Sequence, residues 1–364
     1  MQISSTLSSY IARQFALWIT YVFLALVSII TLFDSIEMMR RASGKADVGL
    51  GIVISMSLLK LPHLVQQTMP FCILFAATMA FWRLARSNEL VVVRAAGISA
   101  WHFLFPAIGV AMATGILLVT LFNPFASVML SKFEQLESQY LKRSTSLLSV
   151  SKTGLWLRQA NETGQSVIHA ARVSQQNVEL GDVIIFLFED DDKFRGRIDA
   201  ESAKLRPGFW DIQNAWITAP NKVAQFKKSY RIDTDLTENK ILDSFASPQT
   251  MSFWDLPGFI ETLESAGFSG HRHKLYWHSL LASPFLLGAM VLIAAIFSLR
   301  ITRRSSASVA VTGAVFCGFI LYFFTDIIYA LGLSSSIPVM LAAWTPAGVS
   351  ILLGLSVLFH IEDG

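Results

Sequence analysis

Six apolar runs of about twenty residues, each nearly free of charge, constrain the fold of this chain more than any other feature. A helix of about 20 apolar residues is long enough to cross the hydrocarbon core of a bilayer. Of the 364 residues, 53% are hydrophobic, and the mean hydropathy is +0.51, which is too apolar for a water-soluble protein of this length. The sequence therefore predicts an integral membrane protein with six spans, at residues 15–33, 62–82, 101–122, 276–299, 307–331 and 338–359.

The second apolar run is too long for a single span and is interrupted by polar residues and proline. Residues 48–82 make 35 positions, about 50 Å as a helix, which is longer than one crossing. Lys60, Pro62 and His63 also interrupt the apolar pattern. We expect an amphipathic interfacial segment first, and then the span 62–82 with a kink near Pro70.

The charged residues gather between the third and fourth runs. Of the 55 Asp, Glu, Lys and Arg residues, 32 lie between Lys132 and Asp243. Apolar and polar side chains alternate here with the period of a β-strand, and turn signals such as Arg206-Pro-Gly208 separate the strands. This pattern predicts an antiparallel sandwich or jelly roll. The expected strands are 154–158, 166–170, 182–188, 209–218 and 223–232.

The predicted fold is a membrane α-helical bundle of six transmembrane helices with an inserted all-β, jelly-roll-like domain. Residues 1–123 carry the first three spans, with a short helix at 88–97 between the second and the third. Residues 124–250 form the β domain, 251–275 an amphipathic helix and a linker, and 276–364 the last three spans.

Positive charge indicates the orientation of the bundle. Arg13 precedes the first span and Arg300 follows the fourth, which places both positions in the cytoplasm. The β domain then lies on the far side of the membrane. Arg40, Arg41 and Lys45 follow the first span on that same far side, where cations are usually few. Three cations in this place require a functional reason.

The segment between the second and third spans has the features of a short capped helix. Asn88 can cap its first turn, Glu89 lies where a helix N-terminus favours negative charge, and Gly97 follows its end. Leu90 and the valines that follow it form an apolar face, and Arg83, Arg86 and Arg94 flank the segment. A helical positive-inside loop and a docking surface for another protein both fit this pattern.

Small side chains recur every fourth residue along the fifth span. Ser306, Ala310, Ala314 and Gly318 form a row that lets another helix approach closely, as at a helix interface or a lateral gate. The partner helix could belong to this chain or to another subunit. Asp326 is the one charge within this span, and it is either a functional residue or a polar residue at an interface.

The sequence lacks the motifs of nucleotide-binding and nucleophilic enzymes. It contains no Gly-x4-Gly-Lys-Ser/Thr loop, no His-Glu-x2-His and no Gly-x-Ser-x-Gly. His271, His273 and His278 lie close together, but basic and aromatic residues are typical of a membrane entry, so we expect no metal site. The two cysteines lie in apolar runs, which favours core packing over a disulfide. No catalytic residue and no cofactor are expected, and energy for transport must come from another polypeptide.

Nearly end to end, the chain resembles the LptF/LptG permeases, which export lipopolysaccharide across the Gram-negative envelope. The resemblance lies in the 3+3 arrangement around a β domain, in the helix before the fourth span, and in the stretch Arg86-Ser-Asn-Glu-Leu-Val-Val-Val-Arg-Ala-Ala-Gly-Ile-Ser99. Thr153-Gly-Leu-Trp156, Asp326, and Ile337-Pro with Trp344-Thr-Pro346 look more like the LptG type than the LptF type.

The resemblance implies a multi-pass protein of the bacterial inner membrane with its β domain in the periplasm. It implies a complex in which one LptF-like and one LptG-like chain sit on a dimeric LptB-type ATPase, which binds ATP and Mg. An LptC-like periplasmic protein would accept the lipopolysaccharide, and no nucleic acid takes part.

The resemblance also implies roles for particular residues. Glu89, within the coupling set Asn88, Glu89, Leu90 and Arg94, matches the acid that contacts the ATPase. Arg40 and Arg41, with Lys45, fall where the family holds the lipid phosphates, which accounts for the misplaced cations. His63 lies where the family can have a basic residue, although a histidine is only partly charged.

Three other readings remain open from the sequence. A lipoprotein-release or FtsX-like permease usually has four spans, with its external domain after the first. A membrane-embedded lipid-modifying enzyme would have to use His63, His102 and Asp326, which form no recognised set. A passive scaffold for envelope assembly would show no nucleotide-dependent change.

Overall fold

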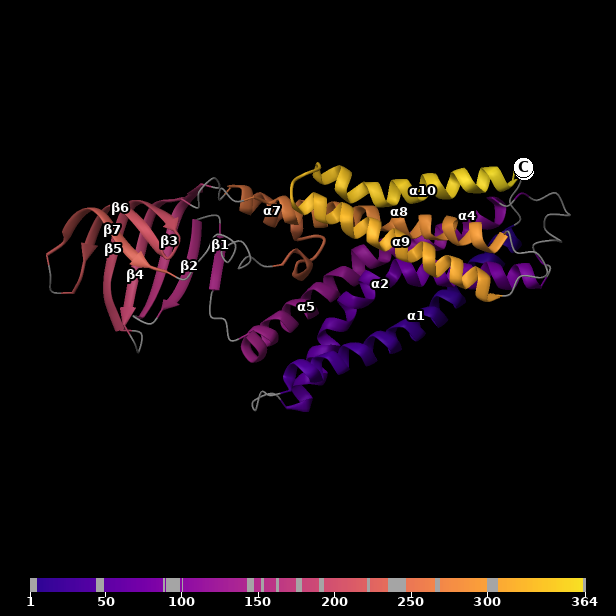
Figure 1. Ribbon diagram of the computed structural model, residues 1–364, viewed down its shortest axis with the longest axis horizontal. Coiled ribbons are helices and arrows are strands. Elements are labelled where there is room, and N and C mark those ends of the chain that lie inside the picture. The colour runs from indigo at the N-terminus through magenta and orange to yellow at the C-terminus, as the bar shows by residue number, and fades with distance from the viewer. Residues whose placement is uncertain are drawn as a thin grey trace. The chain divides into compact units, whose positions relative to one another are not determined.

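The computed structural model describes residues 5–43, 49–87, 89, 99, 101–142, 147–151, 154–161, 164–174, 179–189, 193–220, 223–234, 247–265, 269–299 and 307–362. These residues form two compact units, one of helices and one built on a β-sheet (Figure 1). The helical unit comprises Met1–Leu141, Ser252–Trp254 and Lys274–Gly364. The sheet unit comprises Lys142–Met251 and Asp255–His273.

Six helices of the described chain are long and apolar enough to cross a membrane, as the sequence predicts. Three precede the sheet and three follow it (Figure 1). The bundle consists of α1 (Ser5–Ala42), α2 (Leu50–Arg86), α4 (Trp101–Leu117), α5 (Asn123–Glu137), α8 (His271–Leu299), α9 (Ala307–Leu333) and α10 (Val339–Glu362).

Helix α2 is one uninterrupted helix, so no break separates the segment before Pro62 from the span 62–82, and the interfacial position of that segment stays a prediction. Pro62 and Pro70 both lie inside the helix, where neighbouring helices compensate for the backbone hydrogen bonds that proline removes. In the first turns of α2, Val53 and Met56 are buried against α1 and α5, in a cluster with Phe133. Packing therefore extends this helix beyond the length that one crossing requires.

The third membrane helix also continues further than the sequence indicates. A π-helical turn, η1 (Leu118–Phe122), joins α4 directly to α5, and a second one, η2 (Ser138–Lys142), ends the element. The sequence places the start of the polar domain at residue 124. However, Pro124 occupies the first turn of α5, where proline costs little, and Asn123 is helical with φ −60° and ψ −45°.

The core of the helical unit lies around α2, with α1, α4 and α8 packed against it. Phe81 of α2 and Phe103 of α4 are buried and meet edge to face, with ring centroids 6.1 Å apart. Helices α4 and α8 lie very close together at Gly115, where an added Cβ would lie 2.6 Å from the Cα of Pro284. A larger residue at 115 would therefore push these two helices apart.

The sheet unit contains seven antiparallel strands that follow one another in sequence order. Gly208 has φ +86° in the turn between the fifth and the sixth strand. The antiparallel sheet is confirmed, whereas its description as jelly-roll-like stays a prediction. The strands are β1 (Leu147–Ser151), β2 (Gly154–Asn161), β3 (Gly164–Ser174), β4 (Glu179–Glu189), β5 (Lys193–Arg206), β6 (Phe209–Thr218) and β7 (Gln225–Asp233).

One face of the sheet is a hydrophobic core. Leu157, Ile185 and Trp210 are almost completely buried there, and Leu263 of α7 (Leu256–Ser265) joins the same cluster. The sequence analysis missed β1 and β5. Strand β5 buries mostly small residues, including Ala200 and Ala203, so it lacks the alternation of large apolar side chains that marks the other strands.

Candidate functional site

The first candidate site is the carboxylate of Glu89, which follows the end of α2. The Tyr10 hydroxyl, near the start of α1, donates a hydrogen bond to Oε2 at 3.0 Å, and the Ser87 hydroxyl donates to Oε1 at 2.8 Å. The side chain is half-buried. Within the described residues no cation forms an ion pair with this carboxylate.

The surroundings of Glu89 are basic and aromatic. Arg83 and Arg86 lie in the last turn of α2, where cations stabilise the helix end. The guanidinium of Arg86 lies 5.2 Å from the centroid of the Trp82 ring. The other residues predicted to couple to an ATPase, Asn88, Leu90 and Arg94, lie outside the described residues.

The second candidate site is at the opposite end of α1, where Glu37 binds two arginines. Arg40 contacts both oxygens of Glu37, through Nε at 2.8 Å and Nη2 at 2.9 Å. Arg41 contacts the same carboxylate through Nε at 2.9 Å and reaches Glu137 of α5 at 3.5 Å. These pairs form because Glu37 precedes the arginines by three and four residues on one helix face. Lys45, the third predicted phosphate ligand, lies outside the described residues.

An ion pair between α1 and α2 lies next to these arginines. Lys60 Nζ is 2.7 Å from Oδ1 of Asp34, and it also lies 5.8 Å from the centroid of the Phe133 ring. Asp34 is 8% exposed, and its second oxygen has no hydrogen-bond partner within the described residues. His63 follows one turn after Lys60, is half-buried, and forms no hydrogen bond or ion pair in the described part of the chain.

These six charged residues are called the outer charge cluster below. They comprise three carboxylates and three cations: Asp34, Glu37, Glu137, Arg40, Arg41 and Lys60. Their formal charges sum to zero. The sequence predicts a basic site from the arginines, whereas the structure shows that each of these cations already faces an acid.

Part of the small-residue row on α9 packs within this chain. Ala314 is fully buried, and an added Cβ at Gly318 would lie 2.9 Å from Leu74 and 3.3 Å from Phe71 of α2. Helix α2 is therefore the partner of this part of the row. Ser306 lies outside the described residues, and the side chain of Ala310 is likewise not described. Asp326 is exposed and forms no ion pair or hydrogen bond within the described residues.

Asn123 is a polar contact point that the sequence analysis missed. It is 1% exposed, and its amide nitrogen donates to the Tyr276 hydroxyl at 3.4 Å and to Gln66 at 3.5 Å. Its side-chain oxygen accepts a hydrogen bond from the backbone N–H of Phe253 at 2.7 Å. Trp254 adds a bond from Nε1 to the carbonyl of Thr120, beside the π-helical turn, at 3.1 Å. In the sequence, an Asn-Pro pair is typical of a turn. No local signal indicates that this asparagine is instead buried between helices.

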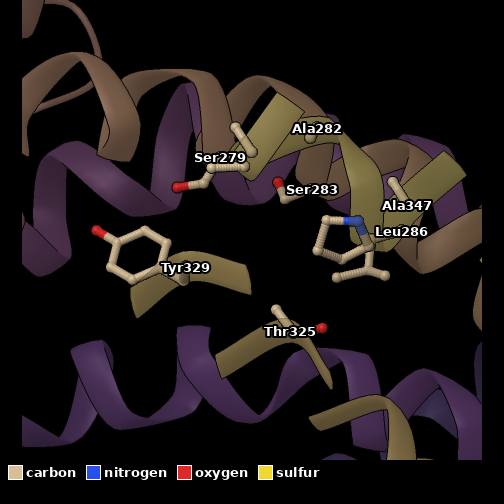
Figure 2. Close-up of a pocket in the computed structure, with 10 residues that line it drawn as sticks. Ser279, Ala282, Ser283, Leu286, Thr325, Tyr329 and Ala347 are labelled. Atoms are coloured by element: carbon tan, nitrogen blue, oxygen red, sulfur yellow. The ribbon is translucent and has the colours of Figure 1, made fainter. Parts of the chain in front are cut away.

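A small pocket of about 60 Å³, partly open to the outside, lies between α8, α9 and α10 (Figure 2). Ser279 and Ser283 of α8 face Thr325 and Tyr329 of α9 across it. The Ser279, Ser283 and Thr325 hydroxyls donate to carbonyls of their own helices at 2.7 to 2.8 Å. The lining contains no thiol, imidazole or carboxylate, so it provides no nucleophile with an adjacent base.

The residues considered for a lipid-modifying enzyme are not brought together. His102 lies at the start of α4, where its Nδ1 is 3.2 Å from the Ser99 hydroxyl. His63 lies on α2 near the outer charge cluster, at the other end of the bundle, and Asp326 is exposed on α9. Within the described residues, no three His, Cys, Asp or Glu side chains are placed to hold a metal ion.

Six membrane-length helices with an antiparallel sheet between the third and the fourth are the architecture of an integral membrane permease. The span count differs from the four spans that an FtsX-like permease usually has. The chain belongs to the family of the lipopolysaccharide export system permease LptF/LptG, whose profile matches residues 9–360.

Curated relatives agree with this assignment. The chain is 26% identical over 369 residues to the lipopolysaccharide export system permease protein LptG of Escherichia coli strain K12, and the match covers 99% of each chain. It is 22% identical over 352 residues to the protein of the same name in Haemophilus influenzae, covering 94% of this chain and 95% of the relative. The resemblance to the LptG type is therefore confirmed.

Proposed function

We propose that this chain is the LptG-type permease subunit that moves lipopolysaccharide out of the inner membrane, driven by a separate ATPase. The observation that carries this proposal is the family match over residues 9–360, which leaves almost no part of the chain for another function. An LptF-like chain, an LptB-like ATPase dimer that binds ATP and Mg, and an LptC-like acceptor complete the complex. The sheet unit lies in the periplasm.

The Glu89 carboxylate receives force from the ATPase in this mechanism. In the described part of the chain, Glu89 accepts hydrogen bonds from two neutral hydroxyls and forms no ion pair. A cationic group of the ATPase can therefore bind it without displacing an internal ion pair. Glu89 acts with Asn88, Leu90 and Arg94, which the family resemblance places in the same coupling segment.

Helix α1 connects this contact to the outer charge cluster. Tyr10 and Arg40 are 30 positions apart in one continuous helix, a distance of about 45 Å at 1.5 Å per residue. The hydrogen bond from Tyr10 fixes the start of α1 to Glu89. A displacement of Glu89 therefore moves α1, and with it the arginines at the far end of this helix.

The arginines hold the lipid phosphates. Arg40 and Arg41 present side chains that are 77% and 47% exposed, and a guanidinium binds two phosphate oxygens at once. Lys45 and His63 are further proposed contacts. His63 is the weakest of these, because it is half-buried and lies on α2 rather than α1.

The acyl chains require an apolar path. A twelve-carbon chain in water costs about 10 kcal/mol, at about 0.8 kcal/mol per methylene, so extraction must never expose it fully. Helices α1 and α9 present large apolar side chains on their outer surfaces, among them Leu24, Phe316 and Phe323. We place the lipid entry between such surfaces, with Ser306, Ala310, Ala314, Gly318 and Asp326 on the helix that forms the gate.

Affinity purification from native membranes tests this function. Tagged chain should bring down an ATPase, a paralogous permease and a periplasmic acceptor in fixed ratios. A membrane-embedded enzyme or a passive scaffold would be recovered without a stoichiometric ATPase, and that result would refute the proposal.

A further inference from the structure

Glu37 pairs with both arginines of the proposed phosphate site, and Glu137 is a second acid beside Arg41. The two oxygens of Glu37 accept three N–H groups, two from Arg40 and one from Arg41, at 2.8 to 2.9 Å. Its side chain is 34% exposed, so a ligand can reach the pair of arginines and the acid together. An anion that binds here must therefore compete with a carboxylate that is already in place.

The charge balance decides which anions can compete. The formal charges of the six residues in the outer charge cluster sum to zero, so an anion that binds the arginines must compete with acids that already face them. A phosphodiester headgroup has one negative charge, the same as Glu37, and gains little by replacing it. A phosphomonoester has a charge of about −1.5 to −2 at pH 7 and three acceptor oxygens, so it can bind both guanidinium groups.

We propose that Glu37 is a displaceable counter-ion that makes the Arg40–Arg41 site selective for phosphomonoester headgroups over phosphodiester headgroups. This inference rests on the proposed phosphate role of the two arginines. Such selectivity matters for extraction from a bilayer, because phosphodiester lipids surround the site there in large excess. Without the counter-ion, two unneutralised arginines would bind these surrounding lipids as well.

Exchange at this site needs side-chain movement alone. Glu37 is on the same helix as both arginines, so its carboxylate can rotate away while the backbone stays in place. Arg41 keeps a second acid, Glu137 of α5 at 3.5 Å, which holds α1 against α5 during the exchange.

The ion pair between Asp34 and Lys60 has a different role. Its side chains are 7% and 22% exposed, and removal of one partner would leave a buried charge without compensation. This pair fixes α1 to α2, whereas the more exposed Glu37 is the acid that an anion can displace.

Lipid binding to the Glu37→Gln variant tests the inference. The intact complex is reconstituted in phosphatidylcholine nanodiscs, and bound lipid is counted by native mass spectrometry. The two probes are dioleoyl phosphatidic acid, a phosphomonoester, and dioleoyl phosphatidylglycerol, a phosphodiester with the same acyl chains. Wild-type protein should prefer phosphatidic acid. In the variant, phosphatidylglycerol binding should rise by about three- to tenfold, and the preference should shrink accordingly.

The matched control is Glu261→Gln, at an exposed glutamate of α7, which should bind both probes as wild type does. An unchanged preference in Glu37→Gln would overturn the inference, and so would an equal loss of both lipids, because Glu37 would then only orient the arginines. The double variant Arg40→Gln with Arg41→Gln tests the phosphate role of the two arginines separately from the role of Glu37. If it binds both probes normally, the proposed phosphate role is itself wrong.

Discussion

The two ends of α1 hold their charged groups in different ways. At one end the carboxylate of Glu89 accepts hydrogen bonds from two hydroxyl groups, one of them that of Tyr10. At the other end Arg40 and Arg41 both pair with Glu37 on the same helix, and Arg41 also reaches Glu137. A carboxylate held by hydroxyls can bind a cationic partner at once. A guanidinium held by a carboxylate binds only an anion that outcompetes it, so the first end favours docking and the second favours selection.

The largest effect is expected from the buried ion pair next to the arginines. Lys60→Met should reduce the free energy of unfolding by about 3 kcal/mol, because Asp34 then remains as an uncompensated buried charge. Thermal unfolding in a fixed detergent measures this. The double variant Asp34→Leu with Lys60→Met should recover most of the loss. Lys132→Met, at an exposed lysine of α5, is the control, and equal unfolding temperatures for Lys60→Met and Lys132→Met would contradict the structural role.

Charge reversal at Glu89 tests the docking end. Glu89→Lys should lower ATP-driven lipid transfer by about tenfold or more, because it places a cation against the cationic partner that the acid binds. Transfer from vesicles to purified acceptor protein measures this, and the amount of ATPase recovered with the chain is recorded in parallel. Normal assembly together with normal transfer would remove Glu89 from the mechanism.

Charge reversal at the selecting end should have a smaller effect. Arg40→Glu with Arg41→Glu should reduce the stimulation of ATP hydrolysis by lipopolysaccharide about fivefold, while hydrolysis without lipid stays unchanged. Steady-state hydrolysis by the purified complex, with and without lipid, separates the two quantities. A response equal to that of wild type would show that these arginines do not hold the lipid.

The mildest change removes one hydroxyl between Glu89 and α1. Tyr10→Phe should leave assembly intact and lower lipid transfer by about threefold, because one hydrogen bond to a charged group is lost. Tyr21→Phe is the matched control, since Tyr21 is 61% exposed on the same helix. Equal transfer by the two variants would show that α1 is not moved through Tyr10.

The sequence predicts the membrane part well because long apolar runs determine it. The ends of these helices are harder to predict, because tertiary contacts override local signals. Pro62 and Asn123 look like helix breaks in the sequence, yet both lie within helices and among neighbouring helices. In the sheet unit, the strands with large buried side chains are predictable. Strand β5 is not, because its core-facing side is made mainly of small residues.

In the candidate sites too, contacts between residues close in sequence could be predicted, whereas contacts between distant residues could not. The pairing of Glu37 with Arg40 and Arg41 follows from their spacing on a helix and could be predicted locally. The pair between Asp34 and Lys60 joins residues 26 positions apart, and the contact between Tyr10 and Glu89 spans 79 positions. Only the packing of different helices brings such residues together, so the sequence alone indicates candidate residues but not the residues that contact them.

The most direct test of the account follows the movement of α1 in the intact complex. A spin label on Met39→Cys, at an exposed position beside Arg40, reports on the far end of the helix after Cys72 and Cys317 are replaced by alanine. The account predicts that a non-hydrolysable ATP analogue changes the mobility of the label in wild type, and that Glu89→Gln abolishes this change. A label that is insensitive to nucleotide in wild type, or equally sensitive in Glu89→Gln, would contradict it.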